Sequence, residues 1–438
     1  MTTRERFWDV ENCPGPIVQA TKEELDCEAH FVKNYTRLPA GDYSVRLPLK
    51  LHLDSLGDSY PQALRRFLSL ERKLTKHPGL RVKYAAFMKE YRDLGHMSPV
   101  PASEVSSCRY FLPHHCVMKE DSTTTKLRVV FDGSAATSTG YSLNDVLMAG
   151  PVIQPKLFHI LIRFRSHPVA VTGDICKMYR CVKVSQEDSY LQCIVWRDSP
   201  IDDLQVYKLD TVTYGTKPAS FLSVRAMQQL SIDEQASFPM GSEILRRDFY
   251  VDDLISGSGT VKDAISIMQQ TAGILAKGKL KLRKWCSNIP LVLEGVPAED
   301  KESFMKFEDG SDFTKTLGLA WDPASDQLLF SFSAFQSPLR PCRRSVLSAI
   351  AKFYDPLGLV GPVITRCKIF LQQLCKEKLS WDESLPETHN TKWLDISQSL
   401  ILRCMGFVMQ ALMPMEPAFM WFLKGIKVLA ICFARSRA

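Results

Sequence analysis

The sequence predicts an α+β fold in which helices cover a sheet. Short apolar stretches with strand character, such as "HPVAVTGDI" and "RRDFYVDDLI", are followed by stretches whose apolar residues recur at helical spacing, such as "ASFLSVRAMQQLSIDE" and "VKDAISIMQQTAGILAK". Strands and helices are therefore interleaved along the chain, and this order is typical of a sheet with helices packed on it.

The predicted elements fall into four segments. Residues 1–95 are a charged helical lead-in, in which "EELDCEAHFVKNY" and "YPQALRRFLSLERKL" have helical spacing and "YSVRLPLKLHL" alternates like a strand. Residues 96–290 hold the stretches quoted above, together with the strand-like "KLRVVFD" and "YLQCIVW". Residues 291–400 contain a hairpin with its turn at 323–326, then a helix, a Pro/Gly break and a second helix. Residues 401–438 form an apolar tail.

Composition indicates an ordinary globular protein. The chain has 438 residues, of which 45% are hydrophobic and 24% charged, and its net charge of +7 favours a polyanionic partner. The 13 cysteines form no CxxC pair and no secretory signal is present, so we expect reduced thiols in an intracellular protein, cytoplasmic or nuclear. No apolar run is long enough to span a membrane. A zinc site at Cys108, His114, His115 and Cys116 is disfavoured because their spacing fits no standard site.

Two adjacent carboxylates, Asp252 and Asp253, interrupt the apolar stretch "FYVDDLI". Like charges repel, so the pair is explained either by a solvated turn or by a bound cation. A third carboxylate, Asp174, follows the apolar run of "VAVTGDICKMY" at another predicted strand end. If the two strands are neighbours, the three carboxylates meet, and they would then need a hard cation such as Mg²⁺.

Six stretches around these carboxylates resemble one known family. In order they are "TTKLRVVFDGSA", "SLNDVLMAGP", "GDICKMY", "VTYGTKPASFLSVRAMQQL", "YVDD" and "LRKWCSN". "YVDD" resembles the catalytic hairpin of reverse transcriptases, and "GDICKMY" resembles their first catalytic motif. The set as a whole resembles the pol polyprotein of Bel/Pao long-terminal-repeat retrotransposons, from about Phe7 to about Trp393.

The resemblance implies a right-hand polymerase fold with fingers, palm and thumb, in which the palm sheet is ferredoxin-like. Residues 96–290 would then be fingers and palm, and residues 291–400 the primer-grip hairpin with the thumb or connection. Asp174 and Asp252 match the carboxylates that bind both catalytic metals, and Asp253 matches the third acid. The implied cofactor is a pair of Mg²⁺ ions, for which Mn²⁺ can substitute.

Four further residues match positions that bind the incoming nucleotide. Arg128 matches the fingers arginine that holds the triphosphate, and Tyr179 matches the aromatic under the sugar. Gly215 matches the glycine before the helix under the templating pair. Lys284 matches the lysine thought to protonate the leaving pyrophosphate. The alternative for Tyr179 is core packing, and the alternative for Lys284 is a solvated basic face.

Two further residues resemble a family motif near the primer end, and two others differ from the residues that the family usually has. Leu317 and Gly318, in "KTLGLAW", resemble the primer-grip hairpin. The chain has Cys181 where the family usually has glutamine, and Lys279 where it usually has glycine. Neither departure falls on an expected metal ligand.

The sequence also leads us to expect no protease and no RNase H. No D-[ST]-G motif occurs, and the family likeness ends near Ile401, where an RNase H domain would begin with an acidic stretch. The codons for "MGFVMQALMPMEPAFMW", read one nucleotide earlier, permit that missing stretch. We therefore expect a frameshift shortly before Met405, which sequencing of the encoding DNA would test.

Two functions compete on this evidence. The first is an RNA-directed DNA polymerase module of a retrotransposon polyprotein, acting on an RNA or DNA template with a primer and dNTPs, without a membrane. The second is a catalytically silent remnant that only binds nucleic acid. The oligomeric state stays open.

Overall fold

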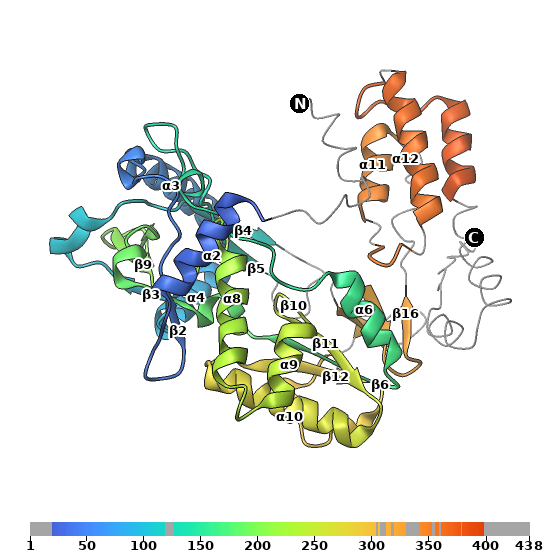
Figure 1. Ribbon diagram of the computed structural model, residues 1–438. Helices are drawn as coiled ribbons and strands as arrows, with labels where there is room; N and C mark the ends of the chain where they lie inside the picture. Colours follow the sequence, from blue (N-terminus) through green and yellow to red (C-terminus); the bar gives the residue numbers. More distant parts are fainter. Residues whose placement is uncertain are drawn as a thin grey trace. The chain divides into compact units, whose positions relative to one another are not determined.

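The computed structural model describes residues 20–118, 127–303, 305–306, 312–316, 319–329, 341–352, 355–358, 361–377 and 379–397. Helices and strands are interleaved through these residues, which confirms the mixed helix and sheet class (Figure 1). The chain divides into two compact units built from separate segments. The first unit comprises Met1–Ile153, Lys177–Leu230 and Lys277–Leu280, and the second comprises Gln154–Cys176, Ser231–Ala276 and Lys281–Ala438. The predicted four-segment division stays a prediction.

The first unit contains small sheets with the strand orders β1-β2-β7, β3-β9-β8 and β4-β5. Its elements are α2 (Lys22–Asn34), β1 (Thr36–Arg37), β2 (Tyr43–Val45), η1 (Leu53–Ser55), α3 (Tyr60–Lys76), α4 (Pro78–Asp93), β3 (Met97–Pro99), η2 (Ala102–Ser107), β4 (His114–Met118), β5 (Leu127–Phe131), α5 (Leu143–Val146), η3 (Met178–Cys181), β7 (Lys183–Val184), α7 (Gln186–Ser189), β8 (Cys193–Trp196), β9 (Gln205–Leu209) and most of α8 (Ala219–Asp233).

The lead-in helices form for reasons visible in the sequence. Thr21 and Glu24 make a reciprocal capping box that satisfies backbone N–H groups at the start of α2. Helix α3 buries Phe67, Leu70 and Leu74, which recur at three- and four-residue spacing along one face. The stretch "YSVRLPLKLHL" is a strand only over Tyr43–Val45, so that prediction is only partly confirmed.

An aromatic cluster around His114 forms part of the first unit's core. The imidazole centroid lies 5.9 Å from that of Tyr84 and 6.1 Å from that of Trp196. Its Nε2 is 3.0 Å from the carbonyl oxygen of Val195, which can only accept, so Nε2 carries the proton and Nδ1 accepts from the Tyr84 hydroxyl. Burial lowers the pKa of His114 to about 4. His114 is therefore a neutral core histidine.

The second unit is built on a four-stranded antiparallel sheet with the order β10-β11-β6-β12. Its elements are α6 (Leu157–Ser166), β6 (Val169–Ile175), α9 (Pro239–Arg247), β10 (Phe249–Tyr250), β11 (Asp253–Ser258), α10 (Val261–Lys277), β12 (Leu282–Ser287), η4 (Pro290–Leu293), η5 (Ala298–Asp300), β13 (Met305–Lys306), β14 (Asp312–Thr316), β15 (Leu319–Asp322), β16 (Gln327–Leu329), α11 (Arg343–Lys352) and α12 (Gly361–Lys376), followed by a helix over 387–397.

This sheet places β6 at its centre. Along the chain, several elements of the first unit and then helix α9 lie between β6 and β10, a two-residue turn joins β10 to β11, and α10 separates β11 from β12. Within the second unit the order is therefore β-α-β-β-α-β, which is the order of a ferredoxin-like sheet. Strand β6 is buried at almost every residue because it is central and both of its faces are covered. Helix α6 contacts β10 and β11, the two strands of the hairpin that carries the adjacent aspartates.

The second unit also holds a second sheet, with the strand order β13-β14-β15-β16, and a group of helices. The predicted hairpin with its turn at 323–326 is confirmed as β15 and β16. The predicted helix, break and helix are confirmed as α11 and α12 (Figure 1). Trp321, Phe370 and Trp393 are fully buried in one hydrophobic cluster that also includes residues of α6, β6 and β11.

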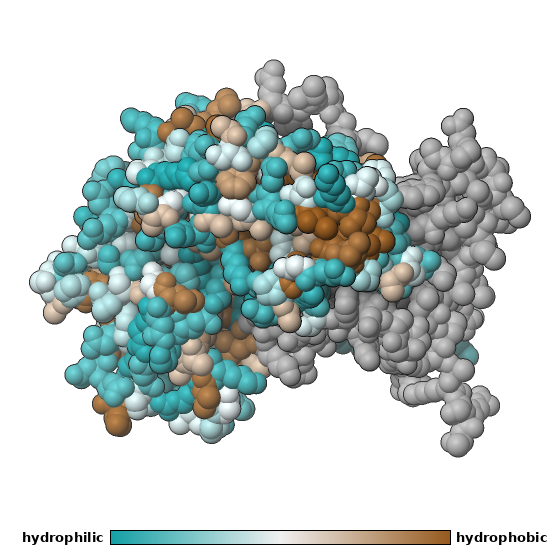
Figure 2. Space-filling model, turned by 90° about the horizontal axis from the view of Figure 1, so that it is seen from below, coloured by the Kyte–Doolittle hydropathy of each residue, from teal (hydrophilic) through white to brown (hydrophobic). Residues whose placement is uncertain are grey.

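Figure 2 shows one face that is hydrophilic over most of its area and carries compact hydrophobic patches. None of the helices in the described residues is both long enough and apolar enough to cross a membrane.

Candidate active site

The β10–β11 hairpin of the second unit brings the adjacent aspartates to the end of the sheet. Phe249 pairs with Leu254 and Tyr250 pairs with Asp253, which leaves only Val251 and Asp252 in the loop. A two-residue loop of this kind reverses the chain without splaying the strands. The structure thus explains how an apolar stretch accommodates two carboxylates: one lies in the turn and the other at the start of a strand.

Val251 has a backbone conformation that is costly for its side chain. Its φ is 59°, whereas Asp252 has no positive φ. Positive φ at the first central residue alone is the pattern of a type II′ turn, a position that glycine normally occupies. A β-branched residue in the left-handed region is an outlier, and such strain gathers at functional sites.

Strand register places the third carboxylate directly opposite. Asp253 of β11 and Asp174 of β6 are antiparallel Cα partners, and the Ile175 N–H donates to the Asp252 carbonyl at 2.8 Å. The structure therefore brings together the three aspartates that the sequence singled out. Opposed like charges destabilise a strand pair, so this arrangement does not serve stability.

The electrostatics of the site show an excess of negative charge. Burial and, after it, the neighbouring carboxylates of Asp252 and Asp174 raise the pKa of Asp253 to about 7, while Lys284 opposes the shift. Burial likewise raises the pKa of Glu302, a residue that the sequence reasoning missed. Carboxylates that resist ionisation in this way mark candidate functional sites.

Two basic residues of β12 reach the same point. Lys284 Nζ lies 3.0 Å from Asp174 Oδ2, and Arg283 Nε lies 3.4 Å from Asp174 Oδ1. Successive strand residues normally point to opposite faces, but Lys284 has a φ of 53° within a register shift between Arg283 and Cys286. This bulge lets both side chains approach Asp174. Lys284 is partly buried and pairs with Asp174 in this structure, and its predicted role stays a prediction.

The donor set suits a hard cation, but the side chains are not gathered around one position. Carboxylate oxygens are the ligands that Mg²⁺ prefers. Within the part of the chain that the structure describes, no group of three or more His, Cys, Asp or Glu side chains is arranged to hold a metal ion. In this structure the oxygens of Asp174 are engaged by Lys284 and Arg283. Metal binding would therefore require these ion pairs to open.

A fourth aspartate, which the sequence reasoning missed, supports the hairpin at its base. Asp248 is 1% exposed, and its Oδ1 accepts from Arg163 Nε at 3.2 Å and from Arg247 Nε at 3.0 Å. Its Oδ2 accepts from the Ser256 hydroxyl at 2.7 Å, and its carbonyl accepts from the Ile255 N–H at 2.9 Å. Asp248 therefore ties α6, the end of α9 and β11 together. Only its position four residues before Asp252 could have drawn attention to it.

The other predicted nucleotide-binding residues lie in the first unit. Tyr179 is in η3, where its hydroxyl is 3.0 Å from the Ser220 hydroxyl, so polar anchoring rather than core packing fixes it. Arg128 is exposed on β5, opposite Val117. Gly215 has a φ of 99°, and a Cβ there would lie 2.0 Å from the Phe131 carbonyl oxygen. Glycine is thus required at this position on steric grounds alone.

The predicted primer-grip residues Leu317 and Gly318 lie outside the described residues. Lys279, where the resembled family usually has glycine, has a φ of 59°. The backbone at this position therefore keeps a conformation that favours glycine, although a lysine occupies it.

The sheet and the site define a mixed α and β protein with a hairpin that carries carboxylates. A comparison with known protein families finds one family that matches part of the chain. Residues 342–412 match the family of Pao retrotransposon-like RNaseH-like domains, which is less than half of the chain. This match supports the predicted relationship to Bel/Pao retroelement pol proteins without identifying a reverse transcriptase region. A comparison with curated proteins returns no match.

The chain is also similar to a solved structure of the foamy viral protease-reverse transcriptase dRH in complex with ds DNA. The two share 13% sequence identity with a TM-score of 0.45, and the likeness covers 71% of this chain. The chain spans about half of that structure's chain, 46%.

The family match corrects one prediction. We expected no RNase H region because the tail lacks the acidic stretch with which such a domain would begin, and because the likeness ended near Ile401. The matched RNaseH-like region instead begins at residue 342 and reaches residue 412. Its described residues include α11, α12 and the helix over 387–397, and the Phe370 ring stacks on the Trp393 ring with centroids 5.7 Å apart. The search for an acidic motif missed it because helical packing, rather than a row of carboxylates, characterises the described part of this region. The expected frameshift before Met405 lies outside the described residues.

Proposed function

We propose that the chain is the RNA-directed DNA polymerase module of a retrotransposon polyprotein. One observation carries the proposal: the register that sets Asp253 directly opposite Asp174, with Asp252 in the turn beside them. Polymerisation of nucleotides needs little covalent chemistry from the protein, and it needs metal-binding carboxylates held at one point. The ferredoxin-like sheet holds Asp174 and Asp253 on paired strands and Asp252 in the turn beside them, and it would correspond to the palm of a right-hand fold.

Asp174, Asp252 and Asp253 would hold the Mg²⁺ ions. Bound there, the ions would activate the primer hydroxyl and stabilise the leaving oxygen of the triphosphate. Lys284, which lies 3.0 Å from Asp174, would supply a cation and a proton donor on the same side of the site. Arg128, Tyr179 and Gly215 keep their proposed nucleotide-binding roles from the sequence resemblance. Template, primer and dNTPs would be the partners, bound through the protein's positive charge.

The ion pairs at Asp174 also support a second function, that of a remnant that binds nucleic acid without catalysis. The ion pairs from Lys284 and Arg283 to Asp174 neutralise part of the site without a metal. A remnant that binds nucleic acid through its basic residues, without catalysis, is compatible with such a site. The two functions differ in their dependence on Mg²⁺ and on the hairpin carboxylates.

A primer-extension assay with the full chain distinguishes the polymerase from the silent remnant. The assay uses a poly(rA) template, an oligo(dT) primer and Mg²⁺ or Mn²⁺, and compares the parent with Asp252→Asn and with Glu294→Gln, an exposed carboxylate of the same unit. We expect extension by the parent and by Glu294→Gln, and at least a hundredfold loss in Asp252→Asn. A folded parent that does not extend the primer, yet binds it with a steep salt dependence, would support the silent remnant instead.

A further inference from the structure

Two cysteines of the first unit, Cys108 and Cys193, lie on neighbouring segments and are not part of the carboxylate site. Cys108 follows η2, and Cys193 is the first residue of β8. The segment after Cys108 runs alongside β8, since Phe111 and Cys193 form a parallel bridge and the Cys193 N–H donates to the Tyr110 carbonyl at 3.0 Å. The Tyr190 carbonyl accepts from Cys193 Sγ at 3.3 Å and from the N–H of Arg109, the residue after Cys108, at 2.9 Å, so the Cys193 sulfur lies beside the backbone next to Cys108.

A buried cation lies beside the same pair. Lys208 of β9 is the antiparallel Cα partner of Cys193 and is 9% exposed. Its Nζ lies 4.9 Å from the centroid of the Tyr190 ring and 3.6 Å from Asp210. The neighbouring Cys193 thiol lowers the pKa of the Cys108 thiol, burial opposes this shift, and the Lys208 charge lowers the pKa further. A thiol with a lowered pKa carries more thiolate, which is the reactive form.

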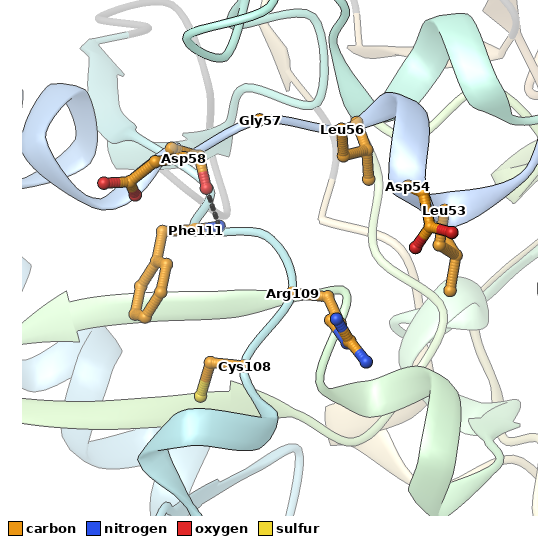
Figure 3. Close-up of a pocket in the computed structure, with 9 residues that line it drawn as sticks. Leu53, Asp54, Leu56, Gly57, Asp58, Cys108, Arg109 and Phe111 are labelled. Atoms are coloured by element: carbon orange, nitrogen blue, oxygen red, sulfur yellow. Dashed lines mark hydrogen bonds between the residues drawn. The ribbon is translucent and has the colours of Figure 1, made fainter.

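The two thiols differ in access. Cys108 is partly exposed and lines a pocket of about 340 Å³ together with Arg109 (Figure 3). Cys193 is fully buried. A small reagent in the pocket therefore meets Cys108 first. An accessible thiol of lowered pKa next to a second thiol is the arrangement found at redox-sensitive cysteines.

We propose that Cys108 and Cys193 are an oxidisable dithiol, which hydrogen peroxide converts to an intramolecular disulfide. In the first step the Cys108 thiolate attacks one peroxide oxygen, so that an S–O bond forms, the O–O bond breaks and hydroxide leaves. The proton that the Cys108 thiol released on ionising converts this hydroxide to water, and Cys108 becomes a sulfenic acid. In the second step the Cys193 sulfur attacks the Cys108 sulfur, so that the S–S bond forms and the oxygen leaves as a second water. The sulfurs lose two electrons in total, which the peroxide gains.

The disulfide would fix one wall of the pocket. It would tie the segment after η2 covalently to β8, where hydrogen bonds and one bridge now hold it. A cross-link of this kind restricts the unfolded chain and so stabilises the first unit. The proposal does not depend on the polymerase function and holds equally for a silent remnant.

Peptide mapping of the full chain tests the proposal. The reduced protein is treated with hydrogen peroxide at pH 7, remaining thiols are alkylated with iodoacetamide, and the digest is analysed without reduction. We expect the Cys108 and Cys193 thiols to disappear together, a peptide linking the two to appear, and dithiothreitol to reverse both changes. Cys116 is the internal control, because it is also partly exposed in the same unit but burial raises its pKa. Cys108 should react about tenfold faster than Cys116.

Variants identify the order of the two steps. In Cys193→Ser, Cys108 should stop at the sulfenic acid, which dimedone traps. In Cys108→Ser, Cys193 should stay reduced at peroxide concentrations that oxidise it in the parent. Lys208→Met should slow the reaction of Cys108, whereas Lys83→Met, at an exposed position of α4, should not. If Cys193→Ser does not fold, the oxidation state of Cys193 in the Cys108→Ser variant still tests the proposal.

Three results would overturn the proposal. The first is oxidation of Cys108 while Cys193 remains open to alkylation after unfolding. The second is a disulfide that joins Cys108 to a different cysteine. The third is oxidation of Cys193 in Cys108→Ser as fast as in the parent.

Discussion

The carboxylates at the base and at the turn of the β10–β11 hairpin have opposite electrostatic surroundings. At the base, Asp248 is 1% exposed and is met by two guanidinium groups and a hydroxyl. At the turn, Asp253 faces Asp252 and Asp174, and its pKa is raised to about 7. A buried carboxylate that is fully paired holds structure, whereas one surrounded by like charges costs stability and is a candidate for function. The hairpin thus combines a support and a site within a few residues.

The largest expected effect comes from breaking the support. Asp248→Asn keeps the shape of the side chain but leaves Arg163 and Arg247 without their counter-charge, so we expect a loss of about 3 kcal/mol in the free energy of unfolding. Urea unfolding at pH 7 measures it. The matched control is Glu243→Gln, which removes an exposed partner of Arg247 and should cost less than about 0.5 kcal/mol. Equal losses in the two variants would show that the buried network at the base is not the support we describe.

The second prediction extends the comparison to a buried polar group without charged partners. His114 is neutral in the folded chain because burial lowers its pKa to about 4, while in the unfolded chain its pKa is about 6.5. The unfolded state therefore binds a proton first, and stability falls as the pH drops through about 6.5 towards about 4. At pH 5 the loss due to His114 should be about 2 kcal/mol. Urea unfolding at pH 7.5 and at pH 5 should show a smaller loss in His114→Gln than in the parent; an unchanged loss would assign the effect to other groups.

The third prediction concerns the turn, where stability is expected to change with pH in the opposite direction to the change expected for His114. In metal-free buffer the folded chain keeps the Asp253 proton up to a pH of about 7, whereas the unfolded chain loses it near 3.8. Stability therefore falls as the pH rises between these values. Asp253→Asn should be more stable than the parent by about 1–2 kcal/mol at pH 8, after solvent screening is allowed for. It should also lose primer extension.

Thermal unfolding in the presence of EDTA measures this gain, with Glu294→Gln as the unchanged control. A destabilised Asp253→Asn would mean that Asp253 has favourable partners and belongs with Asp248 as a structural carboxylate. The comparison between base and turn would then fail.

Much of the site was predictable because it depends on local pattern. The hairpin, the strand that carries Asp174 and the helices α8 and α10 follow from apolar periodicity, which is a short-range property. The meeting of Asp174 with Asp253 depended on which strands are neighbours, and the sequence stated it only as a condition. The RNaseH-like region was missed because the search relied on an acidic motif, although the helices themselves were predicted.

The support at the base could not be predicted in the same way. Arg163 lies on a different element, 85 positions before Asp248, so their contact depends on how α6 packs against the sheet. The stretch "RRDFY" was also predicted as strand, whereas Arg247 ends helix α9 and the strand begins at Phe249. A buried charge network is a property of the tertiary fold, and no spacing within one element reveals it.

The smallest expected effect tests whether the turn stores strain. Val251 holds a φ of 59°, which costs a residue with a Cβ about 1–2 kcal/mol in the folded chain. Val251→Gly removes that cost but loosens the unfolded chain, so we expect a net gain of roughly 0.5–1 kcal/mol in the free energy of unfolding. Val251→Ala is the matched control, because it shortens the side chain yet keeps the Cβ, and it should bring no gain. If both variants gain equally, side-chain crowding rather than backbone strain explains the turn. If only glycine gains while primer extension falls, the strain is what holds Asp252 in place between the two strands.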